Sequence, residues 1–253
     1  MLGVVLSGIS ATAQEPRPLT HVAVFKVKPD KTADWVATVK KVYVPVLQKQ
    51  MADGNLVAYG VDTDTLHRSG EGNADAWYVT PNWSTYEKVS KAIDEAQRRN
   101  AVVLQPLMAA TDPDKHVDMV MRSQFTKQKT PPAGKLPYTS VSVTLLKPGK
   151  GQEYRDLFEK YSKPLLDKLV DNGVIYSYSL DQEVQHSSPP NTRWLVMSMD
   201  SLGAMDKIDE TFKAAFQELG EEGRAAYRRS FDGIVDGPSH RDFLLQAHVF
   251  ASK

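Results

Sequence analysis

The chain has 253 residues, of which 41% are hydrophobic and 25% are charged, as in ordinary globular proteins. Lysine plus arginine and aspartate plus glutamate both number 31, so the formal net charge is zero. Surfaces that bind nucleic acid normally carry a basic excess, so we do not expect nucleic acid as a partner. The absence of cysteine excludes disulfides, thiolate nucleophiles and cysteine metal ligands.

The N-terminal residues form a short apolar run from Leu2 to Ile9, followed by Ala11-Thr12-Ala13. An apolar run before a small-x-small triplet is typical of a secretory signal peptide and its cleavage site. We therefore expect residues 1–18 to be a signal peptide, or else a disordered apolar tail. In the first case the mature protein is periplasmic or secreted. No other run approaches the roughly 20 apolar residues of a membrane span, so none is expected.

The next segment, residues 19–126, has the pattern of one β-α-β-β-α-β module. Its first strand is "VAVFKVKP", and its first helix carries an apolar stripe with spacing i, i+4, i+7, i+11. Pro45 lies near the end of that stripe and should kink the helix. Ser84 and Glu87 suggest a capping box at the start of the second helix. The motif His116-x-Asp118 then opens the fourth strand. The stripe residues are Trp35, Val39, Val42 and Val46.

The chain then repeats this pattern after a linker rich in proline and lysine, residues 127–136, in a second module over residues 137–253. A shift of 119 residues aligns "VAVFKVKP" with "VSVTLLKP", Pro45 with Pro164 and Asp62 with Asp181. We expect Trp77 to match Trp194 after a two-residue loop change, and His116 to match His240 at a shift of 124. An insert, "ELGEEGRAAYRRSFDGIVDG", should add a helix to the second module.

The segment "TLLKPGKGQEYRDLFEKYSKPLLDKLVDNG" resembles the opening of a NIPSNAP-type module in the dimeric α+β-barrel superfamily. That superfamily also holds the antibiotic-biosynthesis monooxygenases and chlorite-dismutase-like haem proteins. The resemblance implies an α+β fold with tandem ferredoxin-like modules whose antiparallel sheets face each other and form a barrel. One chain could then supply both halves, as a monomeric pseudo-dimer or within a homo-oligomer.

Alternation along the strands predicts which side chains face the barrel. We expect the apolar faces to pack on the helices, namely Val22, Val24, Val141, Val143, Phe243, Leu245, Ala247 and Val249. The opposite faces should look into the lumen. They comprise His21, Ala23, Phe25, Asp118, Val120, Arg122 and Gln124 in the first module, and Ser140, Ser142, Thr144, Asp242, Leu244, Gln246 and His248 in the second. These polar groups require a ligand, ordered water, or one another as partners.

The histidines divide into two groups. His116-x-Asp118 and His240-x-Asp242 place both side chains on one strand face, which suits either a metal site or a local scaffold contact. The resemblance places the two pairs on opposite sides of the barrel, so we favour the scaffold and expect no metal. His21 and His248 break the internal symmetry, because their counterparts are Ser140 and Gln124. They are our candidates for a general base or an axial haem ligand, against a purely structural role.

The functional hypothesis is an exported protein that binds a small molecule between its modules, without a cofactor or with haem. The alternatives are a cofactor-free monooxygenase or isomerase, a haem-binding protein, and a non-catalytic structural or oligomer-forming protein. The expected catalytic residues are His248 and His21. The expected ligand-binding residues are Arg122, Gln124, Gln246, Tyr59, Tyr178 and Trp77, although the aromatic residues would serve equally as hydrophobic core.

Overall fold

The computed structural model describes residues 18–66, 72–131, 134–185 and 189–253. The proposed signal peptide, apart from Pro18, lies outside these residues, as do His67 and His186. Within the described part, no helix is both long and apolar enough to cross a membrane.

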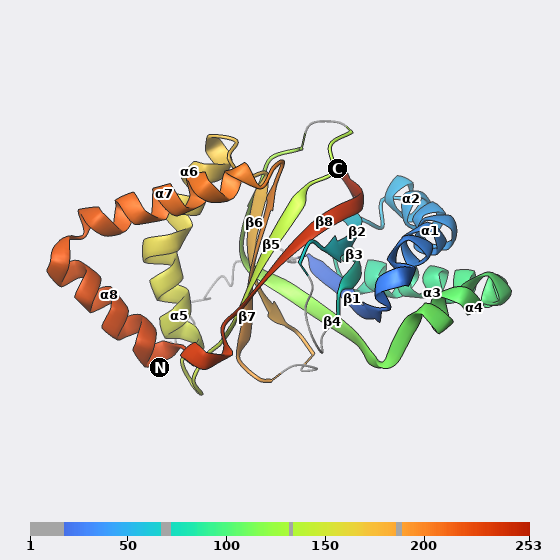
Figure 1. Ribbon diagram of the computed structural model, residues 1–253, viewed down its shortest axis with the longest axis horizontal. Coiled ribbons are helices and arrows are strands. Elements are labelled where there is room, and N and C mark those ends of the chain that lie inside the picture. Colours follow the sequence, from blue (N-terminus) through green and yellow to red (C-terminus); the bar gives the residue numbers. More distant parts are fainter. Residues whose placement is uncertain (1–17, 67–71, 132–133, 186–188) are drawn as a thin grey trace, which may run out of the picture.

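The two modules have matching orders of elements (Figure 1). The first comprises β1 (Leu19–Val27), η1 (Pro29–Lys31), α1 (Thr32–Val42), α2 (Val44–Ala52), β2 (Ala58–Asp64), β3 (Ala74–Thr80), α3 (Trp83–Arg99), α4 (Ala101–Ala110) and β4 (Thr111–Gln128). The second comprises β5 (Tyr138–Leu145), α5 (Gly151–Leu157), the π-helical η2 (Phe158–Ser162), α6 (Lys163–Asp171), β6 (Ser177–Glu183), β7 (Thr192–Met199), α7 (Gly203–Glu218), α8 (Gly220–Ile234), η3 (Gly237–Ser239) and β8 (Arg241–Ser252).

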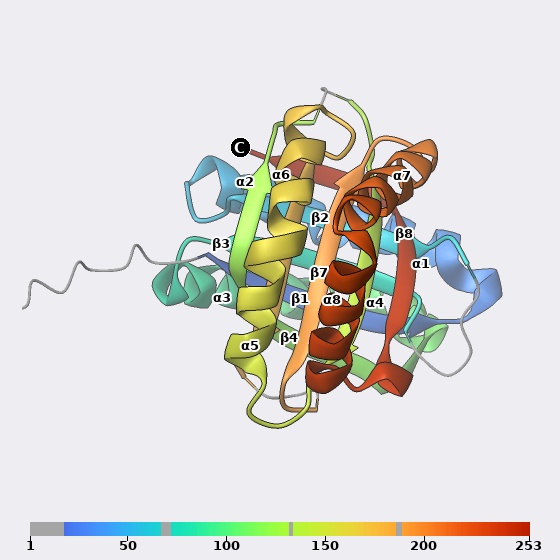
Figure 2. The ribbon, with the colours of Figure 1, turned by 90° about the vertical axis from the view of Figure 1, so that its left-hand side faces the viewer.

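The strands close into one antiparallel barrel in the order β1-β3-β2-β8-β5-β7-β6-β4. Each module contributes four neighbouring strands, and two seams join the modules, β2 with β8 and β4 with β6. The helices of each module cover the outside of its own sheet (Figures 1 and 2). The α+β barrel with two tandem modules is thus confirmed. The fourth strand of each module crosses to the other module's sheet, so neither sheet is left with a free edge there.

Strand pairing shows that the 119-residue shift continues unchanged through β3 and β7. Val22 pairs with Trp77, and the equivalent Val141 pairs with Val196. Asp62 pairs with Asp75, and the equivalent Asp181 pairs with Trp194. The expected equivalence of Trp77 and Trp194 is therefore wrong, because the two tryptophans lie two residues apart in register. The two walls of the barrel differ at these positions.

The prolines interrupt the first helix of each module in different ways. In the first module, α1 ends at Val42 and α2 begins at Val44, with Pro45 in its first turn. In the second, the Lys163 N–H bonds to the Phe158 carbonyl, five residues back, and a π-helical turn precedes Pro164. Proline has no N–H to donate, so the backbone ladder must break or widen at this point. The chain nonetheless continues as a helix beyond both prolines.

Two local expectations need correction. Helix α3 begins at Trp83 and is capped by Asn82, whose side chain accepts from the Thr85 N–H, so the cap precedes the expected Ser84. The insert does not add a new kind of element. Helix α8 has fifteen residues and takes the place in the element order that the ten-residue α4 holds in the first module.

Candidate functional site in the barrel lumen

The barrel holds a partly open cavity of about 1270 Å³ that strands of both modules line. Much of its wall is apolar. The apolar lining residues include Val22, Val24, Met119, Met121, Val141, Val143, Trp194, Val196, Phe243 and Leu245. A cavity of this kind, with a few polar groups at defined points, is the usual form of a small-molecule site.

The lining reverses the expected strand faces. The valines of β1 and β5, with Phe243 and Leu245, face the lumen instead of the helices. The physical reason is that both faces of these strands are covered, so the less polar face need not be the helix side. Polar side chains fit the outer face because helix residues and neighbouring strands offer them hydrogen-bond partners. The apolar side chains form much of the lumen wall.

Asp62 on β2 is the most distinctive polar group of the lumen. Its side chain is 3% exposed, and its Oδ2 accepts a 2.5 Å hydrogen bond from the Trp77 indole Nε1. Gly60 makes this arrangement possible, since a Cβ there would lie 2.5 Å from the indole Cζ2. Burial raises the pKa of Asp62 to about 7, and the bond from Trp77 opposes the rise only in part. Asp75 on β3 is the cross-strand neighbour of Asp62. It is also buried and lines the same cavity.

Asp181 occupies the equivalent position in the second module, on β6. Its Oδ2 accepts a 2.7 Å bond from the Ser179 hydroxyl, and Ser123 is its neighbour across the seam. The counterparts of these serines around Asp62 are Gly60 and Ala247, neither of which has a side-chain donor. Burial raises the pKa of Asp181, and the two serines oppose the rise. The two carboxyls have thus kept their place in the repeat while their partners have diverged.

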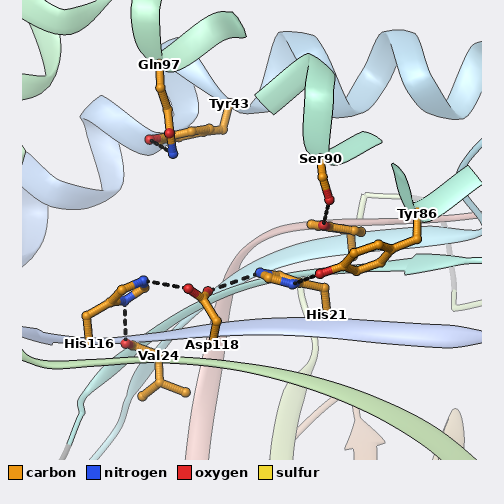
Figure 3. Close-up of polar contacts among 9 residues, drawn as sticks. His21, Val24, Tyr43, Tyr86, Ser90, Gln97, His116 and Asp118 are labelled. Carbon is orange, nitrogen blue, oxygen red and sulfur yellow. Dashed lines mark hydrogen bonds and ion pairs between the residues drawn. The ribbon is translucent and has the colours of Figure 1, made fainter. Parts of the chain in front are cut away.

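His21 lies outside the lumen, under α3, so its expected inward placement is wrong. Its Nδ1 hydrogen-bonds the Tyr86 hydroxyl at 3.1 Å, and its Nε2 lies 3.2 Å from Asp118 Oδ1 (Figure 3). Its ring also stacks on Tyr78, with centroids 4.7 Å apart. These contacts connect β1 to β4 and α3, so His21 has a structural role.

The His-x-Asp motifs form the local contacts expected of a scaffold. His116 Nε2 lies 3.1 Å from Asp118 Oδ2, and His240 Nε2 lies 3.1 Å from Asp242 Oδ2. Asp118 thereby links His116 to His21, as Figure 3 shows. Among the described residues, no group of three or more potential ligands could hold a metal ion.

His248 and Gln124 occupy equivalent β-bulges at the two seams. The pairing of β8 with β2 shifts at Val61/Asp62, and that of β4 with β6 shifts at Ser123/Phe125. His248 Nε2 hydrogen-bonds Thr63 Oγ1 at 2.7 Å, and Gln124 Nε2 donates to Gln182 Oε1 at 2.8 Å. Neither His248 nor its partner Thr63 lines the cavity. The expected inward face of His248 is therefore wrong, because the bulge adds a residue that strand alternation does not count.

The other expected ligand-binding residues divide between the two sides of the wall. Trp77 lines the lumen as predicted. Tyr59 packs beneath α2 and α3, and the Tyr178 hydroxyl donates to Asp167 Oδ1 on α6 at 2.7 Å, so both rings face helices. Gln246 is exposed, and Arg122 does not line the cavity although its neighbours Met121 and Ser123 do. Gln124 and Tyr178 are also among the cavity-lining residues, although the Gln124 amide donates to Gln182 and the Tyr178 hydroxyl to Asp167. The cavity lining therefore includes three of the six expected ligand-binding residues.

The lumen does not fit haem held by either histidine suggested for that role. His21 and His248 are engaged outside the barrel, and no described histidine lines the cavity. The polar lining includes the aspartates and serines described above, together with Gln124, Thr126, Thr192, Arg241 and several lysines.

Sequence reasoning missed Asp62 and Asp181, the two carboxyls that distinguish this cavity. The repeat aligned them, but their neighbours "VDTDT" and "SLDQE" resemble exposed strand ends. A buried carboxyl also runs against the general preference of aspartate for the surface. The available signal was an aspartate retained at the same register in two otherwise divergent copies.

Comparisons with known proteins agree on the fold. No protein-family model and no curated protein matches the chain. Solved structures do match, including two proteins each named a "putative monooxygenase". The one from Lactobacillus acidophilus has a TM-score of 0.64, with 10% identity over 93% of this chain and 96% of that one. The one from Fusobacterium nucleatum has a TM-score of 0.66, with 13% identity over 95% and 96%.

An anthrone oxidase-like protein is similar as well, with a TM-score of 0.60 and 12% identity over 94% of both chains. Likeness at such low identity extends to the fold and not to the activity. The chain therefore shares the α+β-barrel fold of these proteins, with both halves of the barrel in a single polypeptide.

Proposed function

We propose that the barrel lumen binds a small, partly apolar molecule and that the Asp62 carboxyl exchanges a proton with it. The observation that carries this proposal is a buried carboxyl in an apolar-walled cavity of about 1270 Å³. Valine, phenylalanine and tryptophan side chains supply apolar contact, and Asp62 supplies a polar one at a fixed point. The leader-like residues 2–13 are the sole support for our further proposal that the protein is exported.

Asp62 suits proton transfer because its pKa of about 7 leaves both its acid and its base forms populated near neutral pH. The carboxylate can take a proton from a weakly acidic C–H or O–H group of the ligand. Return of that proton to another atom of the ligand is an isomerisation, which needs no co-reactant. The bond from Trp77 holds the carboxyl in one orientation while the exchange takes place.

Cofactor-free oxygenation is the second candidate, and the fold shared with the two proteins named as monooxygenases and the anthrone oxidase-like protein favours it. In that reaction Asp62 would remove the proton, and the electron-rich ligand anion would react with O₂. Oxygen consumption distinguishes this candidate from isomerisation, in which no O₂ is used.

The binding proposal can be tested with N-phenyl-1-naphthylamine, a neutral probe whose fluorescence rises in apolar surroundings. Wild-type protein should bind it saturably. Val141→Trp, which places a large ring in the lumen, should abolish binding. Val102→Trp is the matched control, because Val102 is 77% exposed on α4 and lies outside the lumen. Equal binding by both variants, with unchanged thermal melts, would place the probe elsewhere and refute the proposal.

The proton-transfer proposal has a separate readout in the pH dependence of probe binding. Wild-type affinity should show an inflection near pH 7, where Asp62 titrates. Asp62→Asn keeps the shape and the acceptor for Trp77 but cannot titrate, so its affinity should lack this inflection. An inflection that persists in Asp62→Asn would assign it to another group.

A further inference from the structure

Asp181 belongs to the same cavity as Asp62 but lies on its far wall. Both carboxyls line the lumen, and they are 5% and 3% exposed respectively. They are carried by β6 and β2, which lie four places apart in either direction around the ring of eight strands. Strands so related face each other across a closed barrel. A molecule that fills the lumen would therefore meet one carboxyl on each side.

The hydrogen bonding of Asp181 leaves capacity for a further donor. Its Oδ2 accepts a bond from Ser179, whereas its Oδ1 is buried and accepts no bond of good geometry from the described residues, although the Ser123 side chain lies close enough to lower the pKa of the carboxyl. A buried oxygen without a donor is costly, and because Asp181 lines the cavity, a ligand donor or a water molecule can reach it there. The torsion that exchanges the two carboxyl oxygens is soft, which allows a small adjustment toward a donor in the cavity.

The walls beside the two carboxyls suit an aromatic body. Trp77 on β3 and Trp194 on β7 line the lumen and also lie on strands four places apart in the ring. Their registers differ by two residues, so the two rings are not symmetry mates. Each ring lies beside one carboxyl, because Trp77 bonds Asp62 and Trp194 pairs with Asp181. An aromatic ligand could contact both indoles while its ends approach the carboxyls.

We propose that Asp181 is a second anchor of the lumen site, so that the cavity selects neutral aromatic molecules with a hydrogen-bond donor, such as a hydroxyl group, at each end. This inference rests on the proposed function, since it takes the lumen to be a binding site. Neutral ligands are favoured because burial raises the pKa of both carboxyls, and an anionic ligand beside them would lose its hydration without gaining a cation.

Paired probes that differ by one hydroxyl group test this directly by titration calorimetry on the full chain. The pairs are 2-naphthol with 2,6-dihydroxynaphthalene and, for a longer span, 4-hydroxybiphenyl with 4,4′-dihydroxybiphenyl. For the pair whose length fits, wild-type protein should bind the dihydroxy compound about five- to tenfold more tightly, the gain expected of one added hydrogen bond. Asp181→Leu should reduce that ratio to below about twofold.

The controls separate the possible outcomes. Asp209→Leu, at an exposed position on α7, should keep the wild-type ratio. Asp181→Asn, which keeps an acceptor and the side-chain shape, should retain part of the ratio and covers the case in which the leucine variant fails to fold. If the paired compounds bind wild-type protein equally, the second anchor is refuted while the binding site stands. If none of the four binds, the proposed function itself fails.

Discussion

Replacing Asp62 with asparagine should stabilise the protein, and the gain should depend on pH. Asp62 is 3% exposed, and burial raises its pKa from 3.8 to about 7. A carboxyl whose pKa is higher in the folded state binds its proton more tightly there. Its contribution to stability is therefore fully present below about pH 4 and is lost as the pH rises toward 7. Asparagine does not titrate, so the variant does not lose this stability as the pH rises.

The size of the effect follows from the two pKa values. One pH unit corresponds to about 1.4 kcal/mol, so the interval from 3.8 to about 7 amounts to on the order of 4 kcal/mol. For a protein of this size, about 2–4 °C of melting temperature corresponds to 1 kcal/mol, so Asp62→Asn should gain roughly 10 °C between pH 4 and pH 8 relative to wild type.

The assay is thermal unfolding of wild type and Asp62→Asn in matched buffers from pH 4 to pH 8. Asp30→Asn serves as the control, because the Asp30 side chain is 76% exposed. A difference between wild type and Asp62→Asn that does not change with pH would contradict a buried, protonatable carboxyl in the lumen. Loss of stability on substitution at pH 8 would contradict it more strongly.

Four further outcomes can be checked independently. Asp118→Asn should cost less than about 1 kcal/mol at pH 7, since the carboxyl is half exposed. Hydrogen bonding from His21 lowers the pKa of Asp118, so that cost should vanish as acid protonates the wild-type carboxyl, as urea titrations would show. Gly60→Ala should lower the free energy of unfolding by about 1–3 kcal/mol, because the added Cβ collides with the Trp77 indole. The variant should also show altered tryptophan fluorescence. His248→Ala should lower the free energy of unfolding by about 1 kcal/mol, because it removes the hydrogen bond to Thr63, but calorimetry should show unchanged probe binding. N-terminal sequencing of exported protein should find a start near Gln14, and a start at Met1 would refute cleavage.

The fold was predictable because the chain carries the same pattern twice. The helical stripe, the repeated "VxVxxxKP" strand and the aligned prolines set the order of elements without any knowledge of contacts. The barrel followed from the resemblance of the second copy to a known module. Strand pairing shows that the repeat is more regular than expected, because the shift of 119 residues also relates β3 to β7.

The faces of the strands were not predictable by the same means. In β1, valines alternate with His21, Ala23 and Phe25, so both faces can be buried, and period-two alternation cannot say which one faces helices. The bulges at Gln124 and His248 then change the parity partway along β4 and β8. A bulge of this type leaves no mark in residue type, so strand alternation assigns His248 to the lumen although it lies at the seam between β2 and β8.

A crystal structure of the protein with N-phenyl-1-naphthylamine would test the central claim most directly. We expect density for the probe inside the barrel, in contact with the Trp77 ring and with its N–H directed at the Asp62 carboxyl. Density for the probe on the outer surface, or a lumen closed by side chains in crystals grown at saturating probe, would contradict a small-molecule site in the barrel.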